Sequence, residues 1–153
     1  MNTKPDDALA ILKLYEIRSE PLMRQARAWF MSEFKPQSGL EILGLLQSGE
    51  KQSAFYRMVS SHWEVASALV NNGGIDEKMF LEANTEHLVV FAKLQPFIAE
   101  IRETIGEPDY LAQLEHLVMK AENIERKLEN RRRLLDRWKG NKTSVDSVSA
   151  TTH

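Results

Sequence analysis

Apolar residues recur along this chain at intervals of three and four, the spacing that places them on one face of a helix. In residues 50–71, for example, Phe55, Met58, Val59 and His62 share such a face. Alternating β-branched runs, which are typical of strands, are absent from the sequence. The pattern predicts an all-α fold, which we expect to be a bundle of about five to six helices.

Capping and turn residues divide this pattern into helices. Ser38 and Glu41 have the spacing of a capping box, which indicates the start of a helix. Asp76 can cap another helix, whose apolar stripe continues to Ile105. Pro96 interrupts that stripe and removes a backbone hydrogen bond, so we expect a kink or break there.

The last predicted helix runs from about residue 108 to residue 139 and carries a heptad pattern. Its inner positions step alternately by three and four residues, and Arg131 is the one polar member of the series. This series, here called the seam, consists of Leu114, Leu117, Ala121, Ile124, Leu128, Arg131, Leu135 and Trp138. Because the seam covers nearly four heptads, it predicts a coiled coil in which Arg131 fixes the register by pairing with a glutamate.

The predicted length of this helix suggests how the chain is organised. At about 1.5 Å per residue it would be roughly 45 Å long, which is more than a body of this size needs. The residues that follow are rich in Ser and Thr and lack periodicity. We therefore predict a helical body over residues 1–123, a projecting basic heptad helix over 124–139 and a disordered tail over 140–153.

Charge is distributed unevenly between these parts. Nine basic and four acidic residues between positions 120 and 142 give that stretch a net charge of +5, whereas residues 1–119 carry −6. The chain thus combines an acidic body with a basic arm, residues 120–142. Such a charge distribution indicates what kind of partner the chain could bind and does not indicate its fold. The arm could meet an acidic protein, phosphates or anionic lipid. Glu122 and Glu129 stand four residues before Arg126 and Arg133, so the arm could equally be a solvated helix that needs no partner.

Residues that could carry chemistry are few. The chain has no cysteine, which excludes disulfides, thiolate nucleophiles and cysteine-ligated metals. His62 and His87 lie in apolar stripes and are the strongest polar candidates. No histidine has a glutamate three residues before it, and His-Glu-x-x-His, a glycine-rich phosphate loop and a nucleophile elbow are missing. We therefore expect hydrogen-bonded core or boundary histidines, and a non-enzymatic chain with no cofactor or metal.

The N-terminal residues lack the basic segment and apolar core of a signal peptide. No apolar stretch reaches the roughly 18 residues that a transmembrane helix needs. The sequence therefore predicts a cytoplasmic protein without a transmembrane segment.

Three parts of the chain resemble a family of small bacterial helical proteins classed only as a domain of unknown function. They are Leu14 to Arg27 (LYEIRSEPLMRQAR), His62-Trp63-Glu64 with Leu69 to Ile75, and Leu94-Gln95-Pro96-Phe97-Ile98 through Arg102 to Tyr110. The resemblance covers roughly residues 12–118. It implies a helical fold and no activity. Many members of such a family carry an N-terminal membrane helix, which this sequence lacks.

The function that fits these features is a non-enzymatic interaction or scaffold module. We expect it to self-associate, as a dimer, or to bind a helical protein partner through the C-terminal helix. The expected interface residues are Leu117, Ile124, Leu128, Arg131, Arg132, Arg133, Leu135 and Trp138. The less favoured alternative is a nucleic-acid-binding accessory protein that uses the basic cluster from Arg126 to Lys139.

Overall fold

The computed structural model of the chain describes residues 4–149, with side chains described as far as residue 137. This part of the chain forms eight helices and no strand, which confirms the all-α prediction but exceeds the five to six helices expected. The helices are α1 (Lys4–Ser19), α2 (Pro21–Ser32), α3 (Gly39–Gln47), α4 (Lys51–Asn71), α5 (Glu77–Ala83), α6 (Glu86–Ile105), α7 (Ala112–Met119) and α8 (Ile124–Ser149). None of these helices is long and apolar enough to cross a bilayer.

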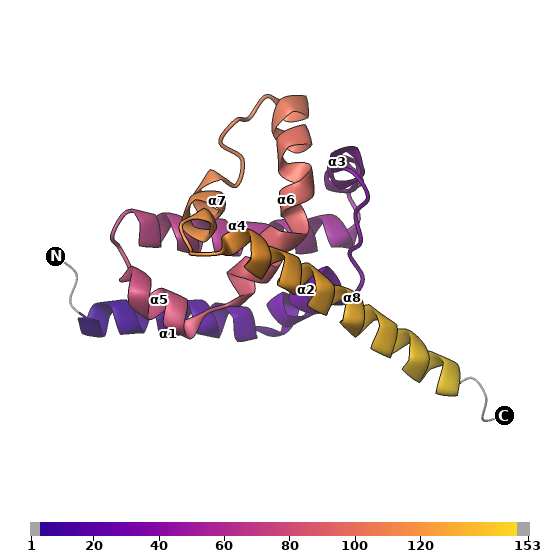
Figure 1. Cartoon of the computed structure of the whole chain (residues 1–153), viewed down its shortest axis with the longest axis horizontal. Coiled ribbons are helices and arrows are strands. Elements are labelled where there is room, and N and C mark those ends of the chain that lie inside the picture. Colours follow the sequence, from indigo (N-terminus) through magenta and orange to yellow (C-terminus); the bar gives the residue numbers. More distant parts are fainter. Residues whose placement is uncertain (1–3, 150–153) are drawn as a thin grey trace.

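One additional break separates α5 from α6, where a single stripe was predicted to continue. The side chain of Asn84 explains it, because its Nδ2 donates to the carbonyl of Phe80 at 3.1 Å and its Oδ1 accepts from Arg18 Nη2 at 3.3 Å. These bonds hold Asn84 extended at the end of α5. The chain continues through Pro96 as helix, and α6 changes direction along its length (Figure 1).

The prediction of one continuous helix over residues 108–139 is wrong. Leu111 and Asn123 both adopt left-handed backbone conformations, with φ values of 56° and 54°, and interrupt it before α7 and before α8. Glu64 of α4 stabilises the first break, since its carboxylate accepts the backbone N–H of Gln113 at 2.6 Å and that of Leu114 at 3.4 Å. A carboxylate at a helix N-terminus both satisfies unpaired N–H groups and complements the helix dipole.

The apolar side of α8 packs on α6 and α2, and the helix then extends beyond the body (Figure 1). It ends at Ser149, later than the predicted end at residue 139, and residues 150–153 of the predicted tail lie outside the described residues. The N-terminal part of α8 therefore belongs to the body rather than projecting from it.

The core is formed mainly by α2, α4, α6 and α7, with contributions from α5 and α8, and is rich in aromatic side chains. Phe30, Tyr56, Trp63, Phe80 and Phe91 are at most 1% exposed. Each aromatic side chain of this size removes a large apolar area from water, so this cluster supplies much of the burial that stabilises the fold.

Candidate functional site

Four apolar residues of the predicted interface are buried within the chain itself. Leu117 is 2% exposed, Ile124 8%, Leu128 0% and Leu135 4%. Leu117 belongs to α7 and the other three to α8, so the heptad spacing joins two helices, and Leu117, Ile124 and Leu128 belong to one hydrophobic core. An interface between chains made by these side chains would first require α8 to leave the body.

The three consecutive arginines of α8 lie in three different environments. Arg132 fastens α8 to α6, since its Nη1 donates to the carbonyl of Ala92 at 2.7 Å. Arg131 is half-buried and has no ion pair with a glutamate among the described residues. Arg133 is exposed and its Nε lies 3.5 Å from Glu129. The side chain of Trp138 lies outside the described residues.

The solvent side of α8 carries arginines at helical spacing. Arg126, Arg133 and Arg137 are exposed and stand seven and four residues apart, so they point roughly opposite to the buried Leu128 and Leu135. We call these three residues the outward arginine face. It spans about 16 Å along the helix axis.

An acidic row runs beside the outward arginine face. Glu125, Glu129 and Asp136 are exposed, and their positions place them along one neighbouring side of α8. We call these three residues the acidic edge. The solvent side of α8 therefore presents two adjacent rows of opposite charge.

His62 and His87 do not form a shared site. Both rings pack against Trp63, with centroid distances of 4.7 Å and 5.9 Å, but they line different depressions of the surface. No group of three or more metal-ligating side chains is present in the part of the chain that the structure describes. The expectation of hydrogen-bonded histidines is wrong for His87, because neither of its ring nitrogens has a hydrogen-bond partner there.

Both imidazoles are held in the neutral form. Burial lowers the pKa of His87 to about 4, and the charge of Arg131 adds to the effect. Burial also lowers the pKa of His62 to about 4, with contributions from Arg18 and Arg27. Each histidine binds a proton more readily in the unfolded chain, so protonation favours unfolding.

This linkage predicts a loss of stability in mild acid. The stability due to neutral His87 is complete above its unfolded pKa of 6.5 and declines as the pH falls towards about 4. Between pH 7 and pH 5, His87 alone should lower the free energy of unfolding by about 2 kcal/mol. Urea denaturation at both pH values measures this loss. His87→Leu should remove about half of the measured loss, because the pKa of His62 is also lowered to about 4 and His62 contributes a similar share. An unchanged pH dependence in that variant would contradict the assignment.

A buried ionic network lies beside these histidines. Arg27 Nε contacts both oxygens of Glu86 at 3.0 and 3.1 Å, and Arg18 Nη1 lies 3.5 Å from the same carboxylate. The Arg18 guanidinium also lies over the Trp63 ring, 5.2 Å from its centroid. Arg18 and Arg27 belong to the stretch that carries the family resemblance, and their contacts give them a structural role.

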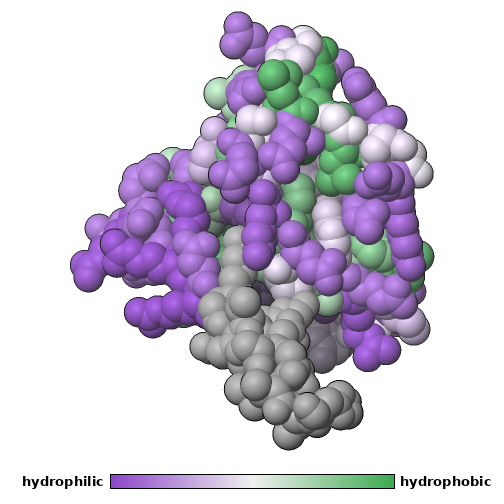
Figure 2. All heavy atoms as spheres, turned by 90° about the vertical axis from the view of Figure 1, so that its right-hand side faces the viewer, coloured by the Kyte–Doolittle hydropathy of each residue, from purple (hydrophilic) through white to green (hydrophobic). Residues whose placement is uncertain are grey.

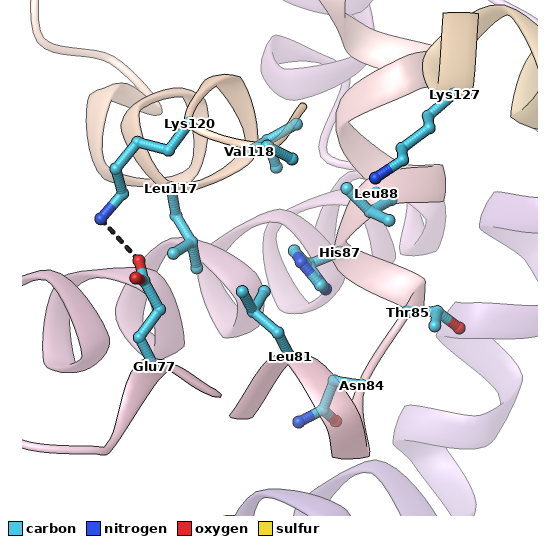
Figure 3. A pocket seen from close by; sticks show the side chains of 11 residues that line it. Glu77, Leu81, Asn84, Thr85, His87, Leu88, Leu117, Val118, Lys120 and Lys127 are labelled. Atoms are coloured by element: carbon cyan, nitrogen blue, oxygen red, sulfur yellow. Dashed lines mark ion pairs between the residues drawn. The ribbon is translucent and has the colours of Figure 1, made fainter. Parts of the chain in front are cut away.

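His87 lies at a pocket between α5, α6, α7 and α8 (Figure 3). The pocket has a volume of about 260 Å³, and its lining combines aliphatic side chains with polar and charged ones. Lys120 and Lys127 also line it, and Lys120 Nζ lies 2.6 Å from Glu77. Sequence reasoning singled out His87 but missed the pocket, because its lining comes from four helices that are separated along the chain.

Comparison with known proteins places most of this architecture in one family. No curated protein and no solved structure matches the chain. The family described as Domain of unknown function (DUF4760) matches residues 5–121, a range that holds α1 to α7 almost completely and ends just before α8. The chain therefore belongs to the DUF4760 family.

Proposed function

We propose that this protein is a non-enzymatic helical module that binds a protein partner with an acidic surface through the outward arginine face of α8. One observation carries the proposal. The apolar side of α8 is used by the protein's own body, whereas three arginines on the opposite side are exposed at positions 126, 133 and 137. A helix anchored through one side offers its other side as a preorganised binding surface, which lowers the entropy cost of association.

The arrangement of charge favours a protein partner over a nucleic acid. A nucleic-acid backbone presents one sign of charge along its whole length. The acidic edge of Glu125, Glu129 and Asp136 lies beside the arginines and would repel it. A helix with its own charged rows can match arginine to carboxylate along one side, and such matching determines partner choice and orientation. Hydrophilic side chains predominate on the surface around α8 (Figure 2).

The same geometry bears on self-association. A dimer built on the seam would need Leu128 and Leu135 at its centre, and both are buried against the body. Releasing them would expose apolar area worth roughly 1.5–3 kcal/mol for each side chain. A partner bound on the outward side leaves this packing intact, and this favours binding of a partner over a dimer built on the seam.

A designed acidic helix tests the proposal. The probe is a labelled helical peptide with glutamates seven and four residues apart, and fluorescence anisotropy measures its affinity. Changing Arg126, Arg133 and Arg137 together to Gln should weaken binding at least tenfold, because it removes all three outward charges. Raising the salt concentration should also weaken binding, since exposed charges are screened.

The matched control removes three exposed charges elsewhere, through Arg24→Gln, Lys35→Gln and Lys78→Gln. It should bind the peptide within about twofold of the wild type. Equal affinity of the two triple variants would count against the outward arginine face. Tighter binding of duplex DNA than of the peptide, lost in the first triple variant, would replace this proposal with the nucleic-acid alternative.

A further inference from the structure

The pocket between α5, α6, α7 and α8 has walls suited to a small apolar group. Leu81, Leu88, Leu117 and Val118 line it, and the apolar part of its surface exceeds the polar part. Its volume of about 260 Å³ lies just below the roughly 300–1,000 Å³ of pockets that enclose drug-sized ligands. A ligand that fits must therefore be smaller than a typical drug and carry a short hydrocarbon body.

A buried polar group points into this pocket. His87 is 1% exposed, and Figure 3 shows its ring directed towards the space between Leu81 and Leu117. Neither ring nitrogen has a hydrogen-bond partner among the described residues. A neutral imidazole carries one N–H donor and one acceptor nitrogen. Buried polar groups are nearly always satisfied, so an unpaired imidazole that lines a pocket indicates that its partner is a ligand.

A lysine side chain also lines this pocket. Lys127 lines it, and Figure 3 shows this side chain running towards Leu88 and His87. Lys127 has no ion pair among the described residues, whereas Lys120 is already paired with Glu77. Lys127 therefore remains as the cation that can meet a negatively charged ligand.

We propose that this pocket binds a small organic acid with a short aliphatic body. The carboxylate contacts the Lys127 ammonium and accepts a hydrogen bond from the N–H of His87. The hydrocarbon part packs between Leu81 and Leu117. The site is distinct from the outward arginine face, since Lys127 points about 100° away from Arg126 on the helix and none of the three outward arginines lines the pocket.

Hexanoate is a suitable probe, because it combines a carboxylate with a short alkyl chain. Isothermal titration calorimetry should show saturable binding of hexanoate to the full chain. Hexan-1-ol, which lacks the charge, and inorganic phosphate, which lacks the alkyl body, should each bind at least tenfold more weakly. The imidazole resonances of His87 should shift as hexanoate is added, which locates the binding in the pocket.

Two variants test the polar contacts. Lys127→Gln should weaken hexanoate binding at least tenfold, whereas the adjacent Arg126→Gln should change it less than about twofold. His87→Leu should weaken binding at least fivefold while keeping a cooperative thermal transition, because no hydrogen bond of the fold is lost. The proposal would be overturned if binding of hexanoate did not saturate at concentrations up to about 10 mM, because a site of millimolar affinity would be mostly filled at that concentration. Equal affinities of wild type and Lys127→Gln, or phosphate binding as tightly as hexanoate, would also overturn it.

Discussion

Replacing Leu128 with alanine is expected to lower the free energy of unfolding by about 2–5 kcal/mol. Leu128 is 0% exposed and belongs to the main hydrophobic core, although it lies on the C-terminal helix. Truncating it removes buried methyl groups and leaves a cavity, and the surrounding side chains collapse only partly into such a space. At this chain length each kcal/mol lowers the melting temperature by roughly 2–4 °C, so thermal denaturation will resolve the effect.

The control for this variant is Leu134→Ala on the same helix. Leu134 is 37% exposed, so its truncation should cost less than about 1 kcal/mol. Light scattering at tens of micromolar separates packing within the chain from packing between chains. Packing within the chain predicts that Leu128→Ala lowers the melting temperature and leaves the mass in solution unchanged. A wild-type dimer that becomes a monomer in this variant would instead place Leu128 between two chains.

The sequence predicts which residues of the C-terminal region are apolar and buried, but not what they pack against. A heptad seam shows that side chains share one side, and four seam residues, Leu114 and Leu117 on α7 with Ile124 and Leu128 on α8, do face one core. The break between these helices has a weak signal, because no glycine or proline lies between Val118 and Ile124. The left-handed Asn123 is the local cue, since asparagine tolerates that conformation better than most residues.

Several features that hold the helices in place depend on contacts between distant residues. Glu64 meets the N-terminus of α7, and Glu100 meets the N–H groups of Gly39 and Leu40 at the start of α3, at 3.0 and 3.2 Å. Nothing in the sequence distinguishes either carboxylate from an ordinary solvent-exposed charge. Their roles follow only once α4 and α6 are placed beside the helices that they cap.

The pocket beside His87 could likewise be predicted only in part from the sequence. Hydrophobic patterning places His87 on a buried face, and that placement is confirmed by its exposure of 1%. Patterning cannot show that α7 and α8 leave a pocket beside it, since the pocket depends on where α8 starts after the break at Asn123. The ionic network around Glu86 was also missed, because Arg27 and Arg18 stand 59 and 68 positions earlier in the chain.

Replacing Glu86 with glutamine is expected to lower the free energy of unfolding by about 2–4 kcal/mol. The Glu86 side chain is 14% exposed and contacts two arginines, of which Arg18 is 13% exposed and Arg27 is 29% exposed. Glutamine keeps the shape and one acceptor oxygen but removes the negative charge. The two guanidinium groups then remain beside each other in a poorly solvated place without their shared counter-charge, and Arg18 is further confined over Trp63.

Exposed ion pairs supply the comparison for this variant. Glu82 lies 3.8 Å from Lys78, and both side chains are more than half exposed, so Glu82→Gln should cost less than about 0.5 kcal/mol. A double-mutant cycle between Glu86→Gln and Arg27→Gln isolates the contact in which the Arg27 Nε–H is shared by both oxygens of Glu86, and we expect a coupling energy of about 1–3 kcal/mol. Coupling near zero, with equal losses in the Glu86 and Glu82 variants, would show that water screens the network as it screens a surface pair. Strong coupling would instead identify Glu86 as the charge that joins α6 to α1 and α2, and so holds His87 at its place beside the pocket.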